Sequence, residues 1–186
     1  MLLKILILAG ALAGTAWAQG TPSPYAGQQA REIKSLSDQE RQDLLEGKGM
    51  GLAKAAELNG YPGPMHVMEL ANQLQLTGEQ RAATRKLLTE HKAAARQLGA
   101  SIVDAERALD EAFAARRADE ATIRKLTGEI ARLQGELRAE HLKTHLAQTA
   151  LLRPEQVRHY AQLRGYGGEG GHGGHGGHGG GHGHHH

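Results

Sequence analysis

Two histidines, His141 and His145, lie four residues apart in a stretch with helical periodicity, so their side chains share one face of a helix. A third histidine, His91, lies in an earlier stretch of the same kind. Three imidazoles with an open fourth position suit Zn²⁺, Cu²⁺, Ni²⁺ or Co²⁺. The chemistry that these residues suggest is therefore coordination of a divalent transition metal, provided that the fold brings them together.

The elements that carry the three histidines are predicted to be two long amphipathic helices. Apolar residues recur in steps of three and four over 87–113 and again over 123–151, which is the spacing of one buried face on each helix. The polar stretch 114–121 separates them, and Asp119 offers a helix start within it. The pattern predicts a long antiparallel helical hairpin within residues 77–164.

Matching the two apolar stripes sets the register of this hairpin. Leu98 then pairs with Leu137, and His91 lies opposite Thr144, one residue before His145. The same register places His141 one helical turn away, so the three imidazoles are predicted to meet at one level. This convergence depends only on the spacing and on the hairpin being formed.

Further ligands are available near this level. A histidine on the apolar face of a short preceding helix is expected to point inward, and two glutamates lie beside the three central histidines. The sequence therefore predicts a metal site in the helical body formed from His91, His141, His145, His66, Glu90 and Glu140. The alternative is that these histidines are packed core residues whose hydrogen bonds to Glu90 or Glu140 need no metal.

The C-terminal segment 165–186 is a second candidate for metal binding. It repeats Gly-Gly-His units, which are typical of metal-binding tracts, and it is too rich in glycine to form a packed core. We expect a disordered tail that binds metal with little selectivity, and more weakly below a pH of about 6.5. Its ligands are His172, His175, His178, His182, His184, His185 and His186. An added purification tag is the alternative explanation.

The first 18 residues have the features of an export signal. A basic residue precedes an apolar run that is too short to span a bilayer, and Ala16, Trp17 and Ala18 form a typical cleavage site. We expect cleavage after Ala18, a periplasmic location and no membrane span afterwards. A disordered leader over 19–27 and one helical domain over 28–164 would follow.

The composition limits the class of protein. The chain has no cysteine, so disulfides are unavailable even in an oxidising compartment. Charges of both signs are interspersed and the net charge is only +2, which argues against a nucleic-acid-binding protein. With one phenylalanine and one tryptophan, the core must rest on alanine and leucine. No HExxH pattern or nucleophile arrangement is present, so we do not expect an enzyme.

Short helices are expected before the hairpin, which makes the fold class all-α. Ser37 and Glu40 form a capping box, the stretch 46–51 (EGKGMG) favours a helix stop, and Pro64 suits the first turn of another short helix. Each glycine inside a helix costs about 1 kcal/mol relative to alanine. Three such glycines suggest close contact between helices: Gly99, Gly128 and Gly135.

Two copies of a short motif carry a resemblance to a known family. The LTxxQ motif is matched by "LQLTGEQ", with Leu76, Thr77 and Gln80, and by "LLRPEQ", with Leu152, Pro154 and Gln156. Thr77 can cap the helix that follows it, whereas Arg153 replaces the threonine in the second copy, so Pro154 alone is expected to begin that helix. With the export signal and the hairpin, these motifs make the chain resemble the Spy/CpxP family, including its ZraP- and CnrX-like heavy-metal-binding relatives.

The resemblance implies an all-helical periplasmic protein that commonly forms a cradle-shaped homodimer. Some members are ATP-independent chaperones or envelope-stress modulators that bind unfolded proteins, and others bind heavy metals or contact a membrane regulator. Metal-sensing members place ligands on the late long helix, where His141 and His145 lie. The leading prediction is a periplasmic metal-binding protein for buffering, resistance or sensing, and the alternative is an ATP-independent chaperone of envelope proteins.

Overall fold

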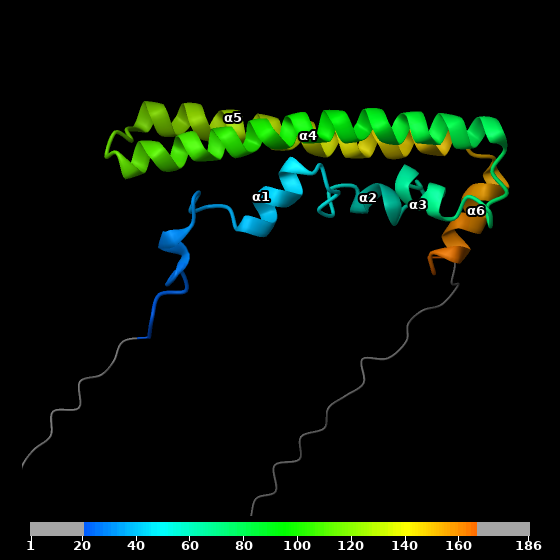
Figure 1. Cartoon of the computed structure of the whole chain (residues 1–186), viewed down its shortest axis with the longest axis horizontal. Coiled ribbons are helices and arrows are strands. Elements are labelled where there is room, and N and C mark those ends of the chain that lie inside the picture. The colour runs from blue at the N-terminus through cyan, green and yellow to red at the C-terminus, as the bar shows by residue number, and fades with distance from the viewer. Residues whose placement is uncertain (1–20, 167–186) are drawn as a thin grey trace, which may run out of the picture. The chain divides into compact units, whose positions relative to one another are not determined.

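A computed structural model describes residues 21–166, and every regular element in that range is helical (Figure 1). The expected all-α class is thereby confirmed. The residues up to Ala30 form one unit and those from Arg31 onward another, and the description below concerns the second. The elements are η1 Gln28–Ala30, α1 Asp38–Leu45, α2 Lys54–Glu57, α3 Pro64–Glu69, α4 Gly78–Ala114, α5 Glu120–Ala150 and α6 Pro154–Leu163.

Some sequence predictions concern residues outside the described range. They are the export signal over 1–18, the first two residues of the leader, and the tail ligands His172, His175, His178, His182, His184, His185 and His186. Within residues 21–166, no helix is long and apolar enough to cross a membrane.

Helices α4 and α5 are the two longest elements and form the predicted antiparallel hairpin (Figure 1). Thr77 accepts a hydrogen bond from the backbone of Gln80 at the start of α4, and Asp119 accepts one from the backbone of Thr122 at the start of α5. These caps satisfy amide groups that the first turn of a helix leaves without partners. Both helices therefore begin where the sequence predicts, directly after Thr77 and Asp119.

The register of the hairpin follows the two apolar stripes. Ile102 and Leu137 are buried in one core cluster, and Leu98 packs against it. At the other end of the same stripes, Thr144 Oγ1 lies 3.0 Å from His91 Nδ1. These contacts confirm the predicted register, because His91 and Thr144 were expected to lie opposite each other.

Helix α1 packs against α4 and ends where the glycine-rich stretch begins. Its start carries the expected Ser37–Glu40 capping box. At its end, Gly47 adopts a left-handed φ of +60°, and the amides of Gly47 and Lys48 donate back to the carbonyls of Leu44 and Asp43. This arrangement is a common helix terminus that glycine favours, so the predicted helix stop is confirmed.

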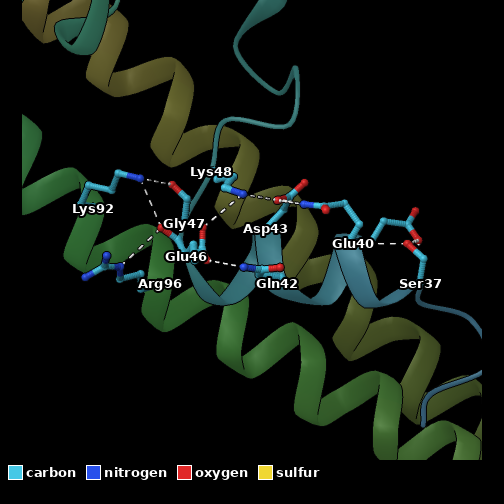
Figure 2. Close-up of polar contacts among 10 residues, drawn as sticks. Ser37, Glu40, Gln42, Asp43, Glu46, Gly47, Lys48, Lys92 and Arg96 are labelled. Atoms are coloured by element: carbon cyan, nitrogen blue, oxygen red, sulfur yellow. Dashed lines mark hydrogen bonds and ion pairs between the residues drawn. The ribbon is translucent and has the colours of Figure 1, made fainter. Parts of the chain in front are cut away.

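Two cations of α4 contact the C-terminal end of α1, as Figure 2 shows. Lys92 Nζ lies 3.3 Å from the carbonyl oxygen of Glu46 and 3.4 Å from that of Gly47. Arg96 Nε lies 3.4 Å from the Glu46 oxygen. Positive charge at this end of a helix is favourable because its free carbonyls carry partial negative charge. The two side chains therefore hold the end of α1 on α4.

The three helix glycines differ in their surroundings. A Cβ added at Gly99 would lie 2.0 Å from the carbonyl oxygen of Leu44 in α1, whereas one added at Gly128 or Gly135 would meet nothing within 4 Å. The predicted close helix contact therefore holds for Gly99 and is wrong for the other two. Gly99 is the point at which the backbone of α1 rests on α4.

A second core cluster closes the end of the hairpin at which α4 begins. Its buried members come from α3, the loop after it, the connection between α5 and α6, and α6 itself: Val67, Ala71, Leu74, Leu76, Leu152 and Tyr160. Beside it, Gln80 and Gln156, one from each motif copy, exchange amide hydrogen bonds of 2.8 and 3.1 Å. Their amides also donate to the carbonyls of Leu151 and Leu74, at 2.9 and 3.0 Å. The motif glutamines thus join the starts of α4 and α6.

The start of α6 differs from the expectation in one respect. The helix begins at Pro154, and Arg153 provides no side-chain cap, as predicted from the missing threonine. However, Gln156 Oε1 accepts a hydrogen bond of 2.9 Å from the Arg153 amide. The prediction that Pro154 alone begins the helix is therefore wrong, because the glutamine of the motif caps it from inside the first turn.

Candidate metal centre

A pocket of about 390 Å³ lies between the hairpin and the segment that carries α2 and α3. Its lining residues include four histidines and one glutamate: His66, His91, His141, His145 and Glu57. Lys92, which holds the end of α1, and Tyr166, the last described residue, also line it. The histidines that the sequence places at one level of the hairpin therefore border one space.

His91 is oriented by two groups on the facing helix. Its Nδ1 lies 3.2 Å from Glu140 Oε1 and 3.0 Å from Thr144 Oγ1. The Thr144 hydroxyl donates to the Glu140 carbonyl at 2.9 Å, so it accepts from the imidazole. Both contacts assign the proton of a neutral His91 to Nδ1 and leave Nε2 free to bind a ligand. A carboxylate in this position is typical of metal-ligating histidines.

His141 is the most deeply buried histidine of the group. Its ring lies edge-on to that of His91, with centroids 4.5 Å apart, and only 4% of its surface is exposed. Burial, and then the nearby charges of His91 and His145, lower its pKa to about 4. His141 Nε2 is buried without a hydrogen-bond partner among the described residues. A neutral nitrogen without a partner is costly unless something binds it, so this atom fits a metal ligand.

His145 is held from the segment between α2 and α3. Its Nδ1 lies 2.7 Å from the carbonyl oxygen of Tyr61, which assigns the proton to Nδ1 and leaves Nε2 as the possible ligand atom. The ring packs closely against Gly63, where an added Cβ would be 2.8 Å from His145 Cε1 and 2.9 Å from Nε2. Glycine at 63 is thus needed for this position of the imidazole.

Replacing Gly63 with alanine is expected to displace the His145 ring without unfolding the protein. The backbone at Gly63, with φ −88° and ψ 149°, is open to alanine, so we expect the free energy of unfolding to change by less than about 1 kcal/mol. Imidazole ¹⁵N NMR would report the loss of the bond to Tyr61. Gly49→Ala is the matched control, because Gly49 lines the same pocket with open space around it. A spectrum of His145 unchanged by Gly63→Ala would contradict the packing described here.

Glu57 is a pocket residue that the sequence analysis missed. Its Oε1 accepts a hydrogen bond of 2.5 Å from Tyr160 Oη, and its Oε2 is buried, without a hydrogen-bond partner in the described part of the chain, 3.6 Å from His145 Nδ1. Burial and this carboxylate raise the pKa of Tyr160. Helix α2 has only four residues, too few for a periodic pattern, so no sequence signal marked Glu57 as inward-facing.

The other predicted ligands are placed differently. Glu140 reaches the site through His91, as described above. His66 borders the pocket, but its Nδ1 is 2.8 Å from Glu69 Oε2. Glu90 is exposed and paired with Lys86 on its own helix, so it does not line the pocket. Within residues 21–166, no group of three or more histidine, aspartate or glutamate side chains is already arranged to hold a metal ion.

Comparison with models of known protein families gives a match. The family described as heavy-metal resistance matches residues 50–159, a range that contains Glu57 and all four histidines of the pocket. The match covers more than half of the 186 residues. No curated protein and no solved structure matches the chain.

Proposed function

The chain belongs to the heavy-metal resistance family, and we propose that it binds a divalent transition metal in the pocket lined by His91, His141 and His145. Zn²⁺, Cu²⁺, Ni²⁺ and Co²⁺ are the ions that suit imidazole nitrogen. The observation that carries the proposal is His141 Nε2, which is buried without a partner among the described residues. With a pKa of about 4 for its imidazole, protons do not compete for this nitrogen near neutral pH.

The neighbouring groups support this assignment. Glu140 orients His91, and the Tyr61 carbonyl orients His145, each through Nδ1. These contacts leave Nε2 of both rings as the atom that can coordinate a metal. Such outer partners commonly strengthen metal binding tenfold to a hundredfold. A metal bound there would accept the lone pair of His141 Nε2 and link α4 to α5.

The setting proposed for this binding is the periplasm. The export signal expected at residues 1–18 supports it, and the paired motif glutamines Gln80 and Gln156 support a Spy/CpxP-like protein. In that setting the protein would buffer the metal, confer resistance or act as a sensor, without enzymatic activity. We also propose that it acts as a homodimer and that a sensing role would involve a membrane stress or metal-response regulator.

Isothermal titration calorimetry with Zn²⁺, Cu²⁺ and Ni²⁺ tests the proposed pocket site. The protein is a full-length variant in which all seven tail histidines are replaced by asparagine, so that only the body can bind. We expect saturable binding that is lost on addition of His141→Leu and kept on addition of His159→Ala, because His159 is exposed and does not line the pocket. Absence of binding by the tail variant would refute the pocket as a metal site.

A chaperone function is a second candidate, supported by a different surface. A groove of about 530 Å³ runs between α1 and the hairpin, lined on one side by Leu36, Leu44, Met50 and Leu52. An apolar groove rimmed by charge, here from Arg138 and Glu40, suits loose binding of partly unfolded chains. Suppression of client aggregation by the metal-free protein, reduced by Met50→Lys, is the expected result. No suppression at equimolar protein would contradict this candidate.

A further inference from the structure

Glu57 directs its two carboxylate oxygens toward two different helices. Oε1 accepts a hydrogen bond of 2.5 Å from Tyr160 Oη in α6, and Arg164 Nε, just after that helix, lies 3.7 Å from the same oxygen. Oε2 lies 3.6 Å from His145 Nδ1 in α5. The side chain of Glu57 is only 13% exposed. One carboxylate of the short helix α2 therefore lies between a histidine of the metal pocket and α6.

The oxygen that faces His145 makes no hydrogen bond of its own. Oε2 is buried without a partner among residues 21–166, which is costly for a carboxylate oxygen. A separation of 3.6 Å is too long for a hydrogen bond, and the Nδ1 proton goes to the Tyr61 carbonyl at 2.7 Å. The neutral imidazole therefore makes little use of Glu57, whose negative charge is available to a ring that gains positive charge.

Binding of a metal at Nε2 of His145 would give the ring that charge. The cation withdraws electrons from the imidazole and makes its Nδ1–H a stronger donor, so metal-ligating histidines commonly have a carboxylate at the other ring nitrogen. His91 already has this arrangement, because its Nδ1 lies 3.2 Å from Glu140 Oε1. At His145 the carboxylate in the corresponding place is that of Glu57. Attraction between charges at this distance is stronger in a largely buried setting than in water.

We infer that Glu57 is a positioning residue of the pocket, which strengthens metal binding through His145 Nδ1 and couples the bound metal to α6. This inference rests on the proposed metal-binding function. Tyr160 and Arg164 hold the carboxylate from the side of α6, so they keep its charge beside the imidazole. By reciprocity, a metal that draws Glu57 toward His145 also stabilises the docking of α6.

Zn²⁺ affinity, measured by competition with a chromophoric chelator, tests the positioning role. The parent is the full-length variant in which the seven tail histidines are replaced by asparagine. We expect Glu57→Gln, which keeps the size of the side chain and removes its charge, to weaken binding tenfold to a hundredfold. Tyr160→Phe, which frees the carboxylate, is expected to cause a smaller loss. Glu90→Gln is the matched control, since Glu90 is exposed and paired with Lys86, and no loss is expected.

Two further measurements separate this role from a merely structural one. The His145 Nδ1 proton is followed by NMR, because a stronger acceptor moves it downfield. Glu57→Gln is expected to move it upfield in the Zn²⁺-loaded protein and to leave it in place in the metal-free protein, where the separation is too long for a bond. Hydrogen exchange of α6 amides is expected to slow when Zn²⁺ binds to the parent, and to slow less at saturation of Glu57→Gln.

Other results overturn the inference in distinct ways. Unchanged affinity in Glu57→Gln, or equal losses in Glu57→Gln and Glu90→Gln, would refute the positioning role and leave the proposed function standing. Equal slowing of α6 exchange in parent and Glu57→Gln would refute the coupling to α6. Absence of Zn²⁺ binding by the parent would refute the pocket site itself. Circular dichroism of the metal-free proteins checks the fold, and Tyr160→Phe decides the matter should Glu57→Gln unfold: unchanged affinity in that variant would then refute the inference.

Discussion

Replacing Gly99 with alanine is expected to lower the free energy of unfolding by about 3 kcal/mol, the upper end of the usual cost of overpacking. The new Cβ would lie 2.0 Å from the Leu44 carbonyl oxygen and 2.6 Å from its carbon. Both are backbone atoms, so no side-chain rotation can relieve the clash, and α1 must move off α4. Urea denaturation followed by circular dichroism measures the loss.

Gly128→Ala is the matched control for that substitution. Gly128 also lies inside a long helix, but an added Cβ there meets nothing within 4 Å. The greater helix propensity of alanine is then expected to raise the free energy of unfolding by about 1 kcal/mol. The two substitutions are the same chemical change with opposite expected signs. A Gly99→Ala protein as stable as the Gly128→Ala protein would refute the contact between α1 and α4.

The stability of the metal-free protein is expected to fall between pH 6.5 and pH 4 because of His141. Its pKa is about 4 in the folded chain, against an ordinary value of 6.5. Above pH 6.5 the imidazole is neutral in both states. As the pH falls, the unfolded chain takes up a proton that the folded chain does not, so unfolding becomes easier by about 3 kcal/mol at pH 4.

The His141→Leu variant isolates this effect from the titration of carboxylates. Those groups titrate alike in both proteins, so the difference in free energy of unfolding between variant and parent reports on residue 141. We expect that difference to shift in favour of the variant by about 3 kcal/mol between pH 7 and pH 4, measured by urea denaturation with chelator present. A constant difference over this range would show that His141 titrates normally in the fold.

The hairpin was predictable because its information is local and repeated. Apolar residues recur every three or four positions over many turns, and two such stripes can be packed against each other in only a few registers. The structure therefore has the predicted positions of Leu98, Leu137 and Thr144, and the His91 ring contacts the His141 ring. The caps at Thr77 and Asp119 follow from short-range chemistry that the sequence displays directly.

The rest of the site depends on contacts between distant segments that leave no periodic trace. Glu57 lies on a helix of one turn, and its partner Tyr160 is 103 residues away. The role of Gly63 appears only once His145 is placed against it. The sequence predicts a close helix contact at both Gly99 and Gly128, although only Gly99 lies against the backbone of another helix. Such distinctions require the positions of the short helices, which tertiary packing decides.

The reciprocal bond between Gln80 and Gln156 makes the two motif copies depend on each other. It fixes α6 to the first turn of α4, and the Gln156 amide also donates to the Leu74 carbonyl in the segment before α4. Gln156 is only 3% exposed, so removal of Gln80 leaves buried amide atoms without partners. The free-energy costs of losing the two glutamines are therefore expected to be non-additive.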